Sequence, residues 1–307
     1  MNRTNKDYLV IMLKGVAMGA ADVVPGVSGG TIAFISGIYE ELLSSISNVN
    51  LSLLKTLKND GLKAAWKQLN GNFLASLFIG MFISVISLAK VISWLLTNHP
   101  ILLWSFFFGL VLASVIYIAK QITKWNIVAI FLVVLGAVLA YYITTLNPMI
   151  SESSSTLFMF FAGAIAICAM ILPGISGSFI LVLLGAYKPV LAAVNNRDFT
   201  TIAAIGAGAI IGLLSFSRVL KYLFSNYKNY TLAILTGFII GSLNKIWPWK
   251  EVLTFRTNSH GEQVAFNEQS ILPFSYDGDP QLMYASLLII IGFAFILLLE
   301  KLAVKEQ

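Results

Sequence analysis

Charged residues are scarce in this sequence. Only 11% of its 307 residues are Asp, Glu, Lys or Arg, whereas 58% are hydrophobic. Soluble globular domains carry about 25% charged residues, so this composition excludes an ordinary soluble fold. Several apolar runs of about 20 residues are long enough to cross a bilayer as helices. The sequence therefore predicts an all-α, multi-pass membrane protein.

Ligands for metals and partners for disulfides are also few. Cys168 is the only cysteine, which excludes an intrachain disulfide and a thiolate metal cluster. His99 and His260 are far apart in the sequence and argue against a zinc site. We therefore expect no metal and no cofactor. The net charge of +6 comes from basic residues scattered over loops, which indicates membrane orientation and not nucleic-acid binding.

Two short segments rich in glycine and serine interrupt the apolar runs. The first loop is Pro25-Gly26-Val27-Ser28-Gly29-Gly30, and the second loop is Pro173-Gly174-Ile175-Ser176-Gly177-Ser178. Proline ends the helix before it, and an apolar run follows, so each loop should precede a new helix. Helix N-termini present free amides and a positive dipole end, which predicts that both loops bind an anion. The alternative is a kink whose small residues only allow close helix packing.

The two loops belong to an internal repeat. Pro173 lies 148 residues after Pro25, and glycines, serines and tyrosines recur together at this spacing. Beyond a longer loop in the first half the spacing shortens, so that Gly208 lies 128 residues after Gly80. Chance agreement of apolar residues would not align these less common residues. The pattern therefore predicts a duplication.

Each half is predicted to hold a broken, re-entrant helical hairpin and three transmembrane helices. Repeat 1 is assigned to residues 1–150 and repeat 2 to residues 151–307, within a single membrane domain. The predicted segments are the hairpins 8–46 and 157–194 and the spans 73–97, 101–120, 126–146, 202–224, 231–247 and 282–303. A hairpin that crosses the membrane twice, or that enters the membrane and returns, has both of its ends on the same side of the membrane. Three further spans are an odd number of crossings, so the second repeat begins on the opposite side of the membrane from the first. Repeats of inverted orientation are typical of secondary transporters.

Loop charges predict the orientation. Loop 47–72 holds four lysines and one acid, whereas loop 248–281 holds five acids against two basic residues. Because cytoplasmic loops are enriched in Lys and Arg, the first loop region should be cytoplasmic and the second should face outside. Both termini are then expected in the cytoplasm. Loop 188–200 is the exception, since it carries Lys188 and Arg197 on the predicted outer side.

Asp22 lies one short turn before the first loop, within apolar residues. An ionisable group at such a place is costly and suggests a function. A protonated Asp22 would not repel a bound phosphate, so it is a candidate for coupling proton movement to anion release. The alternative is a structural partner for Lys14 or for free backbone amides. Met170 stands at the equivalent position, so either role is confined to one repeat.

Two cations, Lys90 and Arg218, occupy equivalent positions in the two repeats. They are interpreted either as cations that bind an anionic headgroup or as residues whose side chains extend to the membrane interface. The candidate substrate-binding residues are Pro25, Gly26, Ser28, Gly29, Gly30, Pro173, Gly174, Ser176, Gly177, Ser178, Lys90 and Arg218.

The string Gly15-Val-Ala-Met-Gly-Ala-Ala-Asp22-Val-Val-Pro25-Gly-Val-Ser28-Gly-Gly30, with Leu172-Pro-Gly-Ile-Ser-Gly177 later, resembles a bacterial polyprenyl-phosphate transporter family, formerly a domain of unknown function. The resemblance covers nearly the whole chain. It implies a translocase of the bacterial inner membrane that returns undecaprenyl phosphate from the outer to the cytoplasmic leaflet for envelope polysaccharide synthesis. The expected partners are this lipid and membrane lipids. The family also implies that the loops around Ser28 and Ser176 take the phosphate.

Two other classes of protein share some of these features. Undecaprenyl-pyrophosphate phosphatases also have inverted repeats and a similar loop, but that loop carries an arginine missing here. Neither loop serine has an evident base or a carboxylate pair in its predicted span, as nucleophilic or metal-assisted hydrolysis requires. We therefore expect no enzyme activity. A channel or transporter for small anions is the third class.

Overall fold

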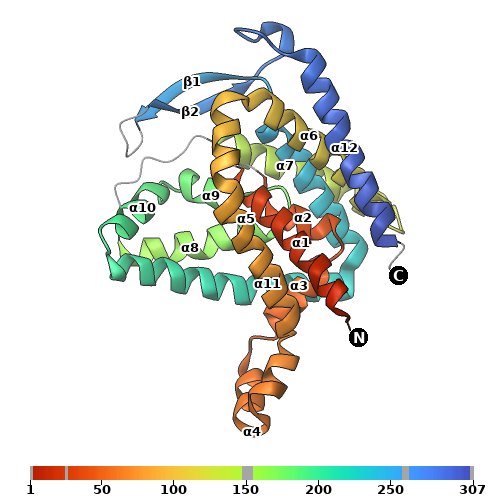
Figure 1. Ribbon diagram of the computed structural model, residues 1–307, viewed down its shortest axis with the longest axis vertical. Helices are drawn as coiled ribbons and strands as arrows, with labels where there is room; N and C mark the ends of the chain where they lie inside the picture. Colours follow the sequence, from red (N-terminus) through yellow and green to blue (C-terminus); the bar gives the residue numbers. More distant parts are fainter. Residues whose placement is uncertain (1–2, 25–26, 147–154, 258–262, 305–307) are drawn as a thin grey trace.

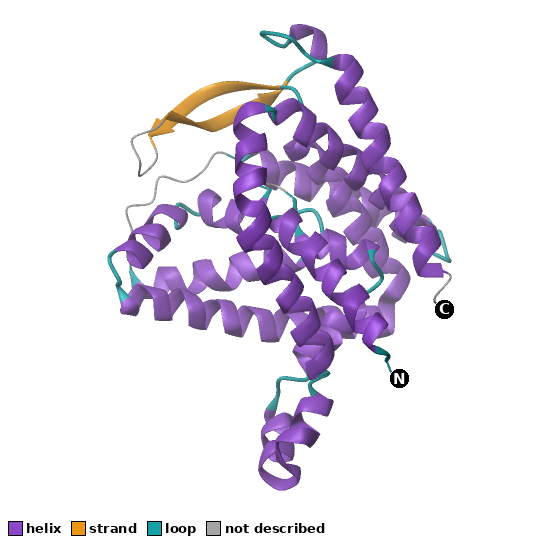
Figure 2. Cartoon of the chain, in the orientation of Figure 1, coloured by secondary structure: helices purple, strands orange, loops and turns teal. Residues whose placement is uncertain are grey.

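The computed structural model describes residues 3–24, 27–146, 155–257 and 263–304. The chain is mostly helical, with one pair of short strands at one end of the helical body (Figure 2). This confirms the prediction of a helical, multi-pass membrane protein at the level of fold class. Helix α4 (Leu51–Gln68) and the strands lie at opposite ends of the molecule (Figure 1).

The first hairpin comprises α1 (Asn5–Val23), α2 (Gly29–Ile35) and α3 (Tyr39–Ser47). Helix α1 begins with a capping box between Thr4 and Asp7. Every residue of α2 is buried, so this short helix lies inside the protein and not against lipid. Gly37 has a φ of +74° in the turn before α3, a conformation that glycine adopts without strain.

The second hairpin comprises α8 (Thr156–Ile171), α9 (Gly177–Leu183) and α10 (Tyr187–Asn195). Helices α9 and α10 form a bent pair with an angle of 104° between them. Gly185, with a φ of +72°, allows this turn at the position equivalent to Gly37. Only Gly177 and Ile180 of α9 are buried. The second hairpin is therefore packed less deeply than the first.

The longer helices are α5 (Gly71–Asn98), α6 (Pro100–Lys120), α7 (Ile127–Thr145), α11 (Phe199–Ser242) and α12 (Leu282–Val304). Among the described residues, four helical runs are long and apolar enough to span a membrane, and the bent pair α9–α10 would make a fifth. The spans predicted at 202–224 and 231–247 correspond to the two parts of one helical run, on either side of a break. This run is kinked at Tyr227, where φ is −135° and ψ is 41°. Figure 1 shows α11 changing direction along its length.

Glycines set the closest helix crossings. A Cβ atom at Gly80 of α5 would collide with the Met12 carbonyl of α1, and one at Gly208 of α11 would collide with the Phe160 carbonyl of α8. Gly109 of α6 packs in the same way on the Ile289 carbonyl of α12. The absence of side chains lets these backbones approach closely, as in other membrane helix pairs.

The predicted outer loop 248–281 contains structure that the sequence pattern did not indicate. Strands β1 (Lys250–Thr257) and β2 (Gln263–Ser270) pair antiparallel, with Lys250 opposite Ser270. The strictly all-α prediction was therefore wrong for this segment. Eight-residue strands with mixed polar and apolar residues give a weak periodic signal, and pairing across the hairpin decides their conformation.

Candidate functional site

The two loops lie directly against each other, although they are far apart in the sequence. The Ser28 hydroxyl donates to the Met170 carbonyl (3.1 Å), near the C-terminal end of α8. The Gly174 amide donates to the Thr31 hydroxyl (3.0 Å) in α2. The structure thus brings both glycine-serine loops to one place, held by hydrogen bonds in both directions.

Two amides of the first loop, those of Gly29 and Gly30, are satisfied by neighbouring residues. The Gly29 amide donates to the Asp22 carboxylate (2.7 Å), and the Gly30 amide donates to the Ser28 hydroxyl (3.1 Å). The Thr31 amide donates to the Ser28 carbonyl (2.9 Å). In this structure Asp22 is therefore a partner for a backbone donor, and its role in proton coupling stays a prediction. An anion at this loop would have to replace its carboxylate.

The second loop is arranged differently. The Ser176 and Ser178 hydroxyl oxygens are 2.8 Å apart, and Ser176 makes no side-chain cap to the amides of α9. Ser176 is buried whereas Ser178 is exposed, so the pair extends from the interior to the protein surface. Gly174 has a φ of +92°, and a Cβ there would lie 2.8 Å from the Ser242 hydroxyl. The second loop consequently rests on the C-terminal end of α11.

The remaining loop residues are closely packed, apart from those outside the described residues. Pro25 and Gly26 of the first loop fall outside them. Pro173 is buried, and so is Gly177, where a Cβ would lie 2.8 Å from the Ala166 carbonyl. At Gly30 a Cβ would lie 2.6 Å from the Ile171 carbonyl. Gly30 and Gly177 are therefore needed for close backbone contact.

Lys90 and Arg218 lie away from the loops. Lys90 is exposed on α5, and the Arg218 guanidinium donates to the Val49 carbonyl (2.7 Å) between α3 and α4. Lys221 on the same helix donates to the Ser47 hydroxyl (3.1 Å). Within the part of the chain that the structure describes, neither predicted cation forms a hydrogen bond or ion pair with a loop residue. Arg218 instead helps to hold the end of the first hairpin.

Lys245 is a cation near the second loop that sequence reasoning did not single out. It lies in the 3₁₀ turn Leu243–Ile246 after α11, and its ammonium is 5.0 Å from the centre of the Phe179 ring. Phe179 directly follows Ser178. A usable signal was present, because Lys245 is a charged residue within a predicted span, but its partner could not be inferred from sequence spacing.

A second cation, Lys250, completes this region. Its ammonium donates to the Lys245 carbonyl (2.6 Å) and lies 3.6 Å from a Glu268 carboxylate oxygen. It also lies 4.6 Å from the centre of the Trp104 ring. Burial lowers the pKa of Lys250 to about 8, because the charged form loses hydration, and Glu268 opposes part of this shift.

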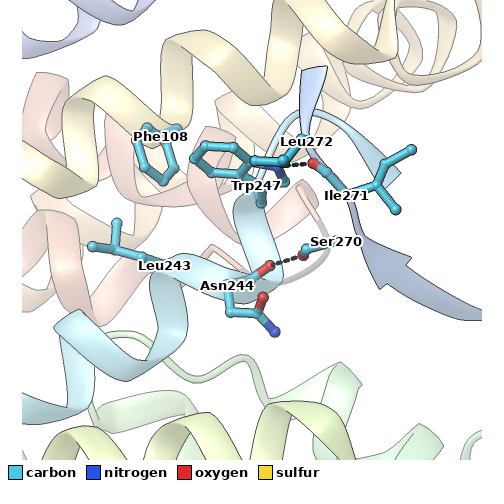
Figure 3. A pocket seen from close by; sticks show the side chains of 7 residues that line it. All are labelled: Phe108, Leu243, Asn244, Trp247, Ser270, Ile271 and Leu272. Carbon is cyan, nitrogen blue, oxygen red and sulfur yellow. Dashed lines mark hydrogen bonds between the residues drawn. The ribbon is translucent and has the colours of Figure 1, made fainter. Parts of the chain in front are cut away.

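A pocket of about 420 Å³ opens beside this turn, and we call it the hairpin pocket (Figure 3). Its lining residues come from α6, from the 3₁₀ turn after α11 with the following Trp247, and from the end of β2 with the two residues after it: Phe108, Leu243, Asn244, Trp247, Ser270, Ile271 and Leu272. The Trp247 indole donates to the Ile271 carbonyl (2.8 Å). The walls are mainly apolar and aromatic. The described residues include no cluster of three or more potential metal ligands of the His, Cys, Asp or Glu type.

Comparison with known proteins agrees with the motif resemblance. The family described as "VCA0040-like: Undecaprenyl phosphate translocase-like" matches residues 18–264. A polyprenyl-phosphate transporter of Vibrio cholerae is 50% identical over 303 residues, which cover 97% of this chain and 98% of that protein. One of Staphylococcus aureus is 34% identical over 254 residues, covering 77% of this chain and 85% of that protein. No solved structure matches. The chain therefore belongs to the undecaprenyl phosphate translocase-like family.

Proposed function

We propose that this protein transports undecaprenyl phosphate, or a close polyprenyl phosphate, from the outer to the cytoplasmic leaflet of the bacterial inner membrane. The observation that carries the proposal is the 50% identity to the Vibrio cholerae polyprenyl-phosphate transporter over nearly the whole of both chains. The structure adds a physical reason. Two discontinuous hairpins meet inside the helical body. In a membrane, irregular backbone is tolerated only where it is buried in protein or lines a cavity, and the meeting point of the hairpins is such a place.

Helix packing supports two inverted repeats. Helix α1 crosses α5 at Gly80, and α8 crosses the first part of α11 at Gly208, which is the equivalent residue. Gly109 of α6 packs on α12, and its equivalent Gly237, in the second part of α11, packs on α7. Each of these pairings, within a half or between the halves, thus has a counterpart, as a duplication requires. Transporters built in this way bind substrate where their repeats meet.

In the proposed site the second loop receives the phosphate first. The Ser176 and Ser178 hydroxyls form a polar pair that reaches the surface, whereas the first-loop amides are already occupied by Asp22 and Ser28. Phosphate would reach the first loop only when the Asp22 carboxylate releases the Gly29 amide. The polyprenyl chain needs no enclosed path, because it can stay in the lipid. Lys90 and Arg218 are left out of this site.

The proposed orientation places α4 in the cytoplasm. This helix carries four lysines, Lys55, Lys58, Lys63 and Lys67, at one end of the molecule. The N-terminal end of α1 and the C-terminal end of α12 point toward the end of the molecule that carries α4 (Figure 1). By the enrichment of positive charge on the cytoplasmic side, both termini would then be cytoplasmic and the strands would face outside.

We propose no catalytic activity. The Ser28 hydroxyl donates to the Met170 carbonyl and accepts from the Gly30 amide, so its hydrogen bonds fix it structurally and none of them involves a base. The decisive experiment uses purified protein in vesicles with labelled undecaprenyl phosphate in one leaflet. We expect protein-dependent movement of the label and no phosphate release from undecaprenyl pyrophosphate. Phosphate release without movement would favour the phosphatase, and flux of inorganic anions without lipid movement would favour the channel.

Asp22 provides a test of proton coupling. Asp22→Asn keeps an oxygen that can accept from the Gly29 amide, but it cannot take up a proton at physiological pH. We expect the variant to fold normally and to transport at a rate that no longer depends on pH between about 5 and 8. Transport should be measured across this range in wild type and variant. A variant that keeps the wild-type pH profile would leave Asp22 with a structural role only.

A further inference from the structure

The Lys245 ammonium lacks an oxygen partner within the part of the chain that the structure describes. The ammonium lies over the face of the Phe179 ring, 5.0 Å from the ring centre. The nearest acid of the region, Glu268, lies 3.6 Å from the Lys250 ammonium instead. Lys245 is partly buried, and a cation withdrawn from water is stabilised by hydrogen-bond acceptors or an anion. Glu268 is thus the carboxylate beside Lys250 and acts on Lys245 only through its charge, so two ammonium groups face one carboxylate and a local positive charge remains.

The hairpin pocket lies beside the turn that carries Lys245. Asn244, the neighbour of Lys245, lines the pocket, and its carbonyl accepts from the Ser270 hydroxyl at 3.2 Å. Figure 3 shows the Asn244 side-chain amide pointing away from Ser270, and no hydrogen bond is recorded for this amide among the described residues. Phe108 and Trp247 pack edge to face, with 5.3 Å between ring centres, and form an aromatic wall. An apolar pocket with an amide and an ammonium nearby suits an amphiphile with an anionic head.

The same turn is connected to the second loop. Phe179, which lies under the Lys245 ammonium, is the next residue after Ser178. Gly174 of that loop packs on Ser242, three residues before Lys245. A headgroup held by Lys245 would therefore be close in the structure to the Ser176 and Ser178 hydroxyls, which are the proposed first contact of the transported phosphate.

We infer that Lys245 is the headgroup cation of the outer-side receiving site and that the hairpin pocket holds the first isoprenoid units of a polyprenyl phosphate. This inference rests on the proposed function for the identity of the lipid. Charge complementarity selects the phosphorylated lipid over the neutral polyprenol, and the apolar pocket selects it over inorganic phosphate. The Asn244 amide donates to a phosphate oxygen beside the ammonium, and the phosphate then passes to the serine pair.

The test compares the affinities of purified protein for a short-chain polyprenyl phosphate and for the corresponding polyprenol. Lys245→Met should lower affinity for the phosphate by about 10-fold, or about 1.4 kcal/mol, while affinity for the polyprenol stays unchanged. Lys245→Arg should keep the wild-type preference. The matched control is Lys58→Met, an exposed lysine on α4 at the other end of the molecule, which should change neither affinity. If methionine lowers the yield of folded protein, Lys245→Gln gives the same readout with a polar, uncharged side chain.

Because the readout is a ratio of two affinities, a general loss of folded protein does not imitate it. A Lys245→Met protein that keeps the wild-type preference for the phosphate overturns the inference, and so does wild-type protein that binds inorganic phosphate as tightly as the lipid. The vesicle assay on wild type separates the two proposals. If wild type moves the lipid but Lys245→Met keeps the wild-type preference for the phosphate over the polyprenol, only the proposed receiving site is overturned. If wild type does not move the lipid, the proposed function is overturned.

Discussion

Gly30→Ala is expected to reduce transport of polyprenyl phosphate by about 10-fold or more. Its Cβ would lie 2.6 Å from the Ile171 carbonyl oxygen and 3.1 Å from the Met170 carbonyl oxygen. Both are backbone atoms at the end of α8, so they can yield only if the two loops separate. Overpacking of this kind costs about 1–3 kcal/mol, and about 1.4 kcal/mol corresponds to a tenfold change in rate. The separation would also stretch the bond between Ser28 and Met170.

The measurement is lipid movement in vesicles that contain equal amounts of folded protein. Gly206→Ala is the matched control, because no atom lies within 4 Å of a Cβ built at Gly206. It should transport as well as wild type and be slightly more stable, since alanine favours a helix by about 1 kcal/mol over glycine. Normal transport by Gly30→Ala would show that contact between the loops is not needed for function.

Gly208→Leu is expected to have the largest effect on stability. Gly208 lies where α11 crosses α8, and any Cβ there would collide with the Phe160 carbonyl. A leucine must push the two helices apart along their contact, which costs about 3 kcal/mol or more. For a chain of 307 residues we expect the melting temperature in detergent to fall by roughly 5 °C or more. The physical cause is steric, so a smaller fall is expected for Gly208→Ala.

Gly206→Leu provides the comparison two residues earlier on the same helix. The space around Gly206 is open, so the leucine should leave the melting temperature unchanged or raise it slightly. Equal losses at both positions would mean that leucine destabilises α11 wherever it is placed. The crossing with α8 would then not be the reason why residue 208 is glycine.

Sequence patterns were sufficient for the class of the protein and for its family. Scarce charge and long apolar runs predicted a multi-pass helical membrane protein, and the motifs around Ser28 and Ser176 led to the family that the comparisons confirm. These properties depend on local composition and on short strings of residues. The division into inverted repeats and the roles of the candidate residues remain proposals, because their tests require function or topology to be measured.

The tertiary structure alone decided which groups meet. Asp22 and the Gly29 amide are only seven residues apart, yet their bond depends on how the chain reverses between α1 and α2. Thr31 and Gly174 are 143 residues apart, and nothing in their spacing predicts a hydrogen bond between them. Hydrophobic periodicity fixes which segments are helices, whereas the packing of backbones at glycines fixes which segments touch.

The amino-acid sequence by itself determined that this chain enters a membrane, that its helices are broken at two glycine-serine loops and that it belongs to a lipid-phosphate translocase family. Only the tertiary structure decided that the Gly29 and Gly30 amides are already satisfied by Asp22 and Ser28, and that Lys245 lies against Phe179 without an oxygen partner among the described residues. The reason is physical. Burial in lipid is a property of a segment, whereas satisfaction of a donor or a charge depends on neighbours that folding brings from distant parts of the chain.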